Sequence, residues 1–437
     1  MRRRLLISSA ILLIGLTTFY LKDGQQLNFA VPVEWIAELA QRHQEQANDG
    51  ASEVEWMNRA LALEEQKDWP ALLDHVRRWT QARPASAPAW YNLGVAYGQS
   101  GQFAQAIDAY RQALRVSPED AVAWSNLGAA YVQSGQFAPA IDAFLQALRV
   151  NPELAMAWNN LGLAYVQSGQ AAQAIDAFRQ ALRVTPEDAG AWRNLGAAYL
   201  QSGQFTQAID ASRQALRVNP EFADAWSNLG KAYFQSGQFT QAIDAFRQTL
   251  RVNPEYAEAW SNQGIAYVQS GQFAQAINAY RQALRVNPED AVAWSNLGDA
   301  YAKSGQFAQA IDALRQALRV NPEYAVAWNN LGFAYFKSGQ AAQAIDAYRQ
   351  ALRVNPELAV AWNNLGFAYD QSGQFTQAID AYRQALRVNP EFAMAWFYLG
   401  IDYKITGQDT QVQEVYRQLT TLSPQLADQF YADFVLH

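Results

Sequence analysis

Residues 121–154 read AVAWSNLGAAYVQSGQFAPAIDAFLQALRVNPEL, and close variants of this stretch recur along most of the chain. A fixed period of 20 to 50 residues indicates a solenoid, in which each repeat packs only on its neighbours. The binding surface of such an array lies on the long face that successive repeats share. The period is 34 residues, and it is marked by ten tryptophans: Trp90, Trp124, Trp158, Trp192, Trp226, Trp260, Trp294, Trp328, Trp362 and Trp396.

Each repeat has the pattern of two helices. In the quoted stretch, apolar and small residues recur at helical spacing over Ala121–Gln133. Gly135 follows where a left-handed residue often ends a helix. A second helix is expected over about Phe137–Val150. Asn151 is then expected to cap the first helix of the next repeat, with Pro152 at its first position.

The first regular repeat carries a set of residues that recurs in the others: Trp90, Leu93, Gly94, Tyr97, Gly101, Ala106, Tyr110, Ala113 and Pro118. This pattern resembles the tetratricopeptide repeat, and it covers residues 87–426 as ten regular repeats. The resemblance implies an all-α fold, in which antiparallel helix pairs wind into a right-handed superhelical solenoid. It also implies a concave groove that is lined by the first helix of each repeat.

Less regular segments flank the ten repeats. Residues 53–86 keep the phase of the array, with Trp56 standing 34 residues before Trp90, and are interpreted as a degenerate repeat. Residues 25–52 are expected to form a linker and a capping helix. Residues 427–437 are expected to form a C-terminal capping helix, because an uncapped solenoid exposes apolar surface at its end.

The N-terminus predicts a membrane segment. Three arginines, Arg2–Arg4, precede an apolar run over Leu5–Leu21. Residues 1–24 are therefore interpreted as a signal anchor, a single transmembrane helix with a cytoplasmic N-terminus. This interpretation places the repeats on the exported side of the membrane, which is the periplasm in a bacterium. A cleaved signal peptide and a transit peptide are the alternatives, although Asn28 makes a cut after Ala30 unfavourable.

Composition argues against catalysis and against nucleic-acid binding. The net charge is −7, whereas affinity for nucleic acid depends on neutralising phosphates. The chain has no cysteine, and its three histidines, His43, His75 and His437, have no partners at metal spacing. No nucleophile motif or glycine-rich phosphate loop is present. The protein is therefore expected to be no enzyme, to use no cofactor or metal, and to bind no small-molecule substrate.

Four positions of the first helix vary between repeats: the second, fifth, ninth and twelfth. Their spacings of three and four residues place them on one helix face, here called the variable stripe. The variable stripe contains large apolar groups at Phe234, Phe333, Phe336 and Phe367. Contiguous exposed apolar groups usually mark an interaction site. The stripe is interpreted as a binding surface, and unconstrained drift is the alternative.

A row of asparagines, here called the asparagine ladder, runs beside the variable stripe at the sixth position of nine repeats. Its members are Asn92, Asn126, Asn160, Asn194, Asn228, Asn262, Asn296, Asn330 and Asn364. An amide can both donate and accept, which suits the backbone of an extended peptide. The ladder is similar to that of O-linked N-acetylglucosamine transferases, and this resemblance implies that it grips peptide backbones. The alternative is that each asparagine bonds within the scaffold or was merely copied with the repeat. Arg193 and Lys231 add positive charge that can attract an acidic group of a ligand.

Two substitutions at core positions predict a weak point in the middle of the array. Ser212 replaces the aromatic residue that stands at Tyr110, and Gln263 replaces the leucine that stands at Leu127. Truncating a buried aromatic side chain typically costs about 3–5 kcal/mol. The repeats around these residues are expected to open first.

Together these features predict a membrane-anchored scaffold or assembly factor that binds extended protein segments in its groove. Its partners are expected to be a protein or peptide in the groove and a membrane at the N-terminal helix. Two other functions remain open. One is a structural array that self-associates or acts as a spacer. The other is a soluble subunit of an envelope secretion or polysaccharide export machine, released by signal cleavage.

Overall fold

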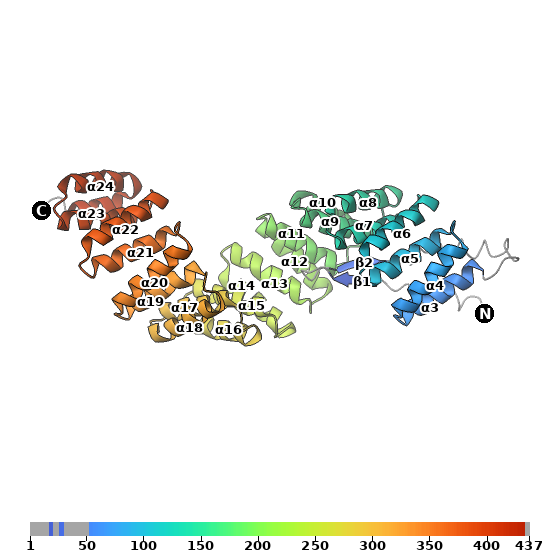
Figure 1. Ribbon diagram of the computed structural model, residues 1–437, viewed down its shortest axis with the longest axis horizontal. Helices are drawn as coiled ribbons and strands as arrows, with labels where there is room; N and C mark the ends of the chain where they lie inside the picture. Colours follow the sequence, from blue (N-terminus) through green and yellow to red (C-terminus); the bar gives the residue numbers. More distant parts are fainter. Residues whose placement is uncertain (1–16, 21–25, 30–51, 433–437) are drawn as a thin grey trace. The chain divides into compact units, whose positions relative to one another are not determined.

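The computed structural model describes residues 17–20, 26–29 and 52–432. The chain divides into two compact bodies (Figure 1), an N-terminal body of Met1–Ala232 and a C-terminal body of Tyr233–His437. The division falls within helix α13, Ala223–Gln235. The expected all-α repeat fold is confirmed, with one short strand pair as the exception.

The helices before the division are α3 (Glu53–Glu65), α4 (Trp69–Ala82), α5 (Ala87–Gln99), α6 (Phe103–Val116), α7 (Ala121–Gln133), α8 (Phe137–Val150), α9 (Ala155–Gln167), α10 (Ala171–Val184), α11 (Ala189–Gln201) and α12 (Phe205–Val218). Those after it are α14 (Phe239–Val252), α15 (Ala257–Gln269), α16 (Phe273–Val286), α17 (Ala291–Lys303), α18 (Phe307–Val320), α19 (Ala325–Lys337), α20 (Ala341–Val354), α21 (Ala359–Asp370), α22 (Phe375–Val388), α23 (Ala393–Ile405), α24 (Asp409–Leu422) and α25 (Pro424–Phe430). In the ten regular repeats, odd labels from α5 to α23 are first helices and even labels from α6 to α24 are second helices.

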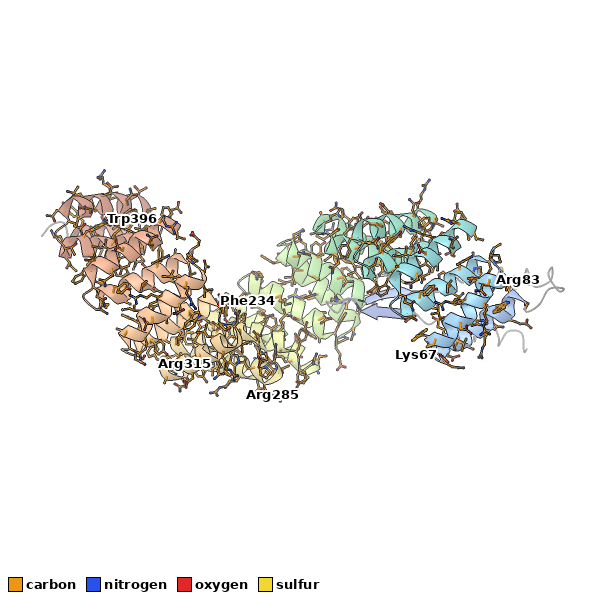
Figure 2. The ribbon with its side chains drawn as sticks, viewed as in Figure 1. Lys67, Arg83, Phe234, Arg285, Arg315 and Trp396 are labelled. Atoms are coloured by element: carbon orange, nitrogen blue, oxygen red, sulfur yellow. The ribbon has the colours of Figure 1, made fainter. Side chains whose placement is uncertain are left out.

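A left-handed residue ends the first helix of every regular repeat. Ten glycines from Gly101 to Gly407 adopt φ between +72° and +80° at this turn. A side chain disfavours this conformation, which explains why glycine recurs there. In the degenerate repeat the same place is taken by Lys67, with φ +54° (Figure 2).

The recurring tryptophan stabilises the turn that joins one repeat to the next by a hydrogen bond from its indole N–H. The Trp124 Nε1 donates a hydrogen bond to the Pro118 carbonyl oxygen at 2.9 Å. The same bond recurs at 2.8 Å from Trp396, which is labelled in Figure 2, to the Pro390 carbonyl oxygen. The indole thus packs and also satisfies a turn carbonyl, so another aromatic residue cannot replace it fully.

A second recurring glycine lets the two helices of a repeat approach closely. A Cβ on Gly128 would stand 2.7 Å from the Phe144 ring, inside van der Waals contact. In repeat 4 the ring is missing, because Ser212 takes its place and is fully buried with an unpartnered hydroxyl. Gln263 is also buried, and its Nε2 donates to the Ile243 carbonyl oxygen at 3.4 Å. The structure thus places both predicted weak positions in the core.

The expected role of the turn asparagine is wrong. Asn151 is the C-cap of α8, and α9 begins only at Ala155. The Asn151 side chain instead accepts a hydrogen bond from the Glu153 backbone N–H at 3.0 Å, which closes the turn between the helices. An N-cap bond forms where a repeat ends in aspartate: the Asp120 Oδ1 accepts from the Ala123 N–H at 2.8 Å.

The N-terminal segment contains a strand where a transmembrane helix was expected. Strand β1 (Thr17–Tyr20) pairs antiparallel with β2 (Gln26–Phe29), and Thr17 stands opposite Phe29. Thr17–Tyr20 thus lie in a strand and not in the expected helix, and their β-branched and aromatic residues favour a strand. The rest of the predicted anchor lies outside the described residues, and so does most of the predicted linker and capping helix over residues 25–52. No helix in the described part of the chain is long and apolar enough to cross a membrane.

Atypical packing occurs at both ends of the array. In the degenerate repeat, the rings of Trp56 and Trp79 stack with centroids 6.4 Å apart. At the other end, Phe430 of α25 is fully buried over Gly400, where a Cβ would meet its ring at 2.5 Å. The helix α25 begins at Pro424, before the expected 427, because proline suits the first turn of a helix.

Candidate functional site

The second position of the variable stripe is exposed and apolar in four consecutive repeats of the C-terminal body. This position holds an apolar residue in each of α17, α19, α21 and α23, with exposed fractions from 38% to 53%. Phe333 adds a ring that is 39% exposed at the ninth position of α19. Apolar groups that recur in register on adjacent helices form one continuous surface. The second-position residues are Val292, Val326, Val360 and Met394.

Aromatic side chains join neighbouring repeats along this surface. The ring centroids of Phe336 and Phe367 lie 5.4 Å apart, and those of Phe367 and Tyr398 lie 5.1 Å apart. Beside them, the Lys337 Nζ lies 5.6 Å from the centroid of the Phe333 ring. Three repeats thus share one half-buried aromatic row, which a ligand can contact without ordering new side chains.

Phe234, the remaining phenylalanine of the predicted site, does not belong to this aromatic row. Phe234 packs on Phe239 within its own repeat, with ring centroids 5.4 Å apart (Figure 2). Conversely, sequence reasoning missed Tyr398 and the apolar second position. The signal for the latter was present, because apolar residues recur 34 residues apart from Val292 to Met394.

In repeats 2 and 3 of the N-terminal body, parts of the same stripe are covered. At the ninth position, Ala129 of α7 and Leu163 of α9 are both fully buried. Val132, at the twelfth position of α7, is buried as well. Strand β2 lies against α7 and α9 (Figure 1). The first-helix face of repeats 2 and 3 therefore carries a strand of the same chain.

The asparagine ladder connects successive repeats. The Asn228 Nδ2 donates to the backbone carbonyl oxygen of Arg193, in the preceding repeat, at 3.4 Å. The equivalent amide nitrogens of Asn194 and Asn364 donate to Asn159 Oδ1 at 2.9 Å and to Asn329 Oδ1 at 3.0 Å. A carbonyl accepts only, so the bond to Arg193 fixes which end of the Asn228 amide faces the scaffold. The ladder thus contributes bonds within the scaffold, as the alternative interpretation expected.

The remaining capacity of the ladder lies in its carbonyl oxygens. The Asn126 Nδ2 donates to the Tyr91 hydroxyl at 2.7 Å, whereas its Oδ1 is buried without a partner. The Asn194 Oδ1 is likewise buried and unpartnered, and in Asn160 both amide atoms are. Asn92, Asn126, Asn160 and Asn194 are buried, and the five later members of the ladder are half-buried. A buried acceptor without a partner is costly and is a natural place for an incoming N–H group.

The two predicted basic residues lie in adjacent repeats. The Arg193 guanidinium lies 5.8 Å from the centroid of the Phe222 ring, and its backbone carbonyl accepts from Asn228. Lys231 stands half-buried on α13. Both residues belong to the N-terminal body.

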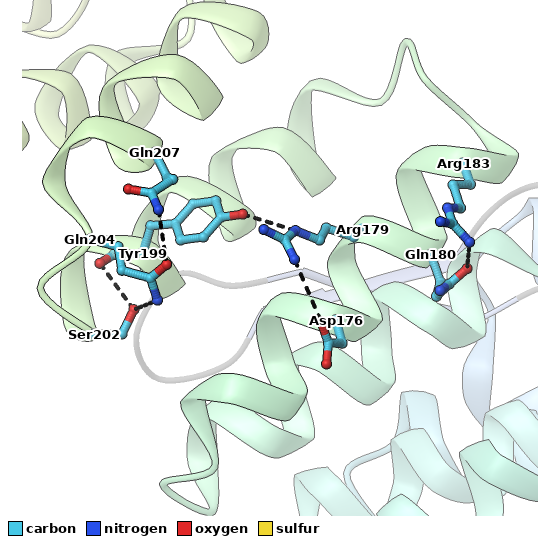
Figure 3. A network of polar contacts seen from close by, with 8 residues as sticks. All are labelled: Asp176, Arg179, Gln180, Arg183, Tyr199, Ser202, Gln204 and Gln207. Atoms are coloured by element: carbon cyan, nitrogen blue, oxygen red, sulfur yellow. Dashed lines mark hydrogen bonds and ion pairs between the residues drawn. The ribbon is translucent and has the colours of Figure 1, made fainter.

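Two hollows of about 480 and 640 Å³ lie away from the variable stripe, over second helices. Figure 3 shows the polar network at the second hollow, where the Arg179 Nε donates to the Tyr199 hydroxyl at 3.0 Å. The guanidinium also lies 5.7 Å from the centroid of that ring and 3.7 Å from Asp176. Arg281 and Tyr301 repeat this contact at the first hollow. These residues recur with the repeat and join it to the next, so they are assigned to the scaffold.

One carboxyl group of the C-terminal body is strongly perturbed. Asp402 is fully buried in α23, at a position where other repeats have alanine. Burial first, and the nearby Asp370 carboxyl group second, raise the pKa of Asp402 to about 8. Ionisation of Asp402 therefore destabilises the folded chain. Over the described residues, no group of three His, Asp or Glu side chains is placed to hold a metal ion.

A chain of stacked helix pairs with an extended apolar face defines a helical repeat protein of the tetratricopeptide class. The chain belongs to the family described as the cilia and flagella-associated protein 70 C-terminal domain, whose model matches residues 38–223 and 223–333. A tetratricopeptide repeat model also matches residues 323–391. The predicted repeat class is confirmed. No curated protein matches the chain.

Several solved structures resemble the chain. MamA is 28% identical, with a TM-score of 0.35, over 38% of this chain and 96% of MamA. YrrB, described as a TPR protein with an unusual peptide-binding site, is 23% identical, with a TM-score of 0.38, over 43% of this chain and 96% of YrrB. The APC/C hetero-tetramer Cut9–Hcn1 is 16% identical, with a TM-score of 0.46, over 90% of this chain and 98% of the matched chain.

Proposed function

We propose that this protein is an interaction scaffold that binds an extended segment of a partner protein along the first helices of repeats 7–10. One observation carries the proposal: the exposed apolar residues of α17, α19, α21 and α23 stand in register and adjoin an aromatic row. Burying such a surface is favourable at about 25 cal/mol per Å² of apolar area. The partner segment is expected to carry apolar or aromatic residues at intervals that match successive helices.

The asparagine ladder is proposed to hold the backbone of that segment. Within repeats 7–10, the Asn364 amide nitrogen is already bound to the preceding repeat, and those of Asn194 and Asn228 are bound in the same way in repeats 4 and 5. The free capacity is therefore the carbonyl oxygen, which accepts from a backbone N–H group of the ligand. The transferase resemblance suggested that each amide both donates to and accepts from the peptide. Where the amide nitrogen is bound within the scaffold, only the carbonyl oxygen can bind the peptide.

Membrane anchoring through residues 1–24, with the repeats on the exported side, is part of the proposal. It is supported by three arginines before an apolar run that ends at Leu21. Insertion requires Thr17–Tyr20 to leave strand β1, because these residues belong to that run. Extraction of membranes at alkaline pH tests it: an anchored chain stays in the membrane pellet, and a peripheral chain is released.

Selection of a displayed random peptide library on the full chain tests the binding face. The affinity of the selected peptide is then measured for wild type and for the double variant Phe333→Ser, Phe367→Ser. We expect a loss of at least about tenfold, since truncating a central aromatic contact typically costs more than 1 kcal/mol. The matched control is Leu145→Ser, because Leu145 is 42% exposed but lies on a second helix. Equal losses in both variants, or a library that yields no binder, contradict the proposal.

A further inference from the structure

We propose that β1 and β2 of this chain are an intramolecular occupant of the first-helix face in repeats 2 and 3. The occupant holds that part of the face closed, and its departure opens the face to another extended segment. The inference rests on the proposed function in two respects, namely that the first-helix face is the binding surface and, for the release of the occupant, that the N-terminal apolar run inserts into a membrane. It adds that the N-terminal part of this face carries its own competing segment.

The first argument is a contrast in burial between equivalent positions. At the ninth position, Ala129 and Leu163 are fully buried on the helices that β2 contacts. The same position of α19 holds Phe333, which is 39% exposed. The larger side chain is thus the more accessible one. Residue size therefore does not account for the contrast, whereas a covering segment over α7 and α9 does.

The second argument is the set of unpartnered polar atoms on the same two helices. The Asn160 side chain is fully buried, and neither its Nδ2 nor its Oδ1 has a partner. The Ser125 Oγ and the Asn126 Oδ1 on α7 are also buried and unpartnered. Among the residues that the structure describes, strand β2 pairs only with β1, along one edge, and its other edge presents backbone N–H and C=O groups. None of these groups is bonded to β2 as it lies against the helices, so they are available to the backbone of another extended segment once β2 leaves.

The third argument concerns the residues of β1. Thr17–Tyr20 form the end of the apolar run over Leu5–Leu21. A residue cannot lie in a strand and in a membrane-spanning helix at the same time. Insertion of the run into a bilayer therefore removes β1 and leaves β2 without its strand partner. A two-stranded pair is marginally stable, so this loss releases β2 from the helices.

Cysteine crosslinking on the full chain tests the contact directly, because the chain has no cysteine of its own. Ala129→Cys is combined with Leu27→Cys or with Asn28→Cys, since neighbouring strand residues point to opposite faces. A short bismaleimide is the probe. We expect an intrachain product from at least one pair, about tenfold above the same pairs made with Asp299→Cys. Asp299 is the matched control, because it holds the ninth position in repeat 7. Yields equal to the control overturn the proposal, and so do crosslinked dimers, which identify a second copy as the occupant.

A thiol-labelling experiment tests the closed state. Leu27→Pro removes a backbone N–H from β2 and disfavours the strand. We expect it to speed maleimide labelling of Ala129→Cys by at least about tenfold and to leave labelling of Asp299→Cys unchanged. Fast labelling of Ala129→Cys in the parent chain overturns the proposal. Peptide binding at repeats 7–10 is read separately in the same variant, so either proposal can fail alone.

Discussion

Replacing Ser212 with phenylalanine is expected to stabilise the middle of the array. Phe178 and Phe246 fill the same place in repeats 3 and 5 and are buried almost completely. The glycine beneath the ring is retained as Gly196, so the backbone recess that admits Phe178 above Gly162 is present in repeat 4 as well. The substitution Ser212→Phe therefore restores the ring that the repeat lacks.

The magnitude follows from three contributions. Full burial of a phenylalanine contributes about 1.5–3 kcal/mol. Removing a buried hydroxyl without a partner contributes about 1–3 kcal/mol more. Adjustment of a core that has packed around Ser212 costs about 1–3 kcal/mol in the opposite direction. The net expectation is a gain of about 2 kcal/mol, or roughly 30-fold in the local opening equilibrium.

Native-state hydrogen exchange measures this effect, because repeats of a solenoid open locally. Exchange in α11 and α12 is expected to slow in Ser212→Phe, while distant repeats of the N-terminal body change little. The reciprocal control is Phe178→Ser, which is expected to lose about 3–5 kcal/mol in α9 and α10. Unchanged or faster exchange in α11 and α12, with the control behaving as expected, refutes the reasoning and shows that the recess has closed.

Three further substitutions test other parts of the account. Asp402→Ala is expected to raise thermal stability by about 1–3 kcal/mol at pH 8 and by less at pH 4. The pKa of Asp402, about 8 in the folded chain, lies above its usual value, so the folded state is favoured at low pH and loses stability as pH rises from about 4 to about 8. Equal shifts of the melting temperature at both pH values contradict this. In other repeats an arginine at this position lies over a tyrosine ring of the following repeat, and Leu145→Arg places a guanidinium near the equivalent Tyr165. We expect this variant to stabilise repeats 2 and 3 by about 0.5–1 kcal/mol. Hydrogen exchange measures the effect, with Leu145→Gln as the control. Lys67→Gly removes the conformational cost of a side chain at positive φ and is expected to raise the free energy of local opening in α3 and α4 by about 1 kcal/mol, measured as slower hydrogen exchange. A destabilised variant argues against strain at this turn.

The repeat itself is readable from the sequence because its determinants are local. A glycine at Gly135 is required by a positive φ, and the break there separates two helices whose bounds match those expected for residues 121–150. The role of Asn151 was not predictable from residue type. Asparagine favours both helix caps and turns, and the choice depends on where the next helix starts, four residues later.

The binding face is only partly readable from the sequence. The variable stripe follows from helical spacing, but its cover in the N-terminal body depends on β2, which stands more than 90 residues before α7 in the chain. Contacts at such separation leave no local pattern. The hydrogen-bond partners of the asparagine ladder are equally hard to predict from the sequence. Asn228 donates to a backbone carbonyl of the preceding repeat, and the position of that carbonyl depends on how the repeats pack.

The most direct test of the central claim is hydrogen exchange of the full chain with and without the peptide selected from the library. The account predicts slower exchange in the first helices α17, α19, α21 and α23, whose stripe carries the exposed apolar residues. It predicts little change in the second helices α18, α20 and α22. Protection confined to the second helices would place the ligand on the other side of the helix pairs, near Arg281, Asp312 and Gln316, and would contradict the account.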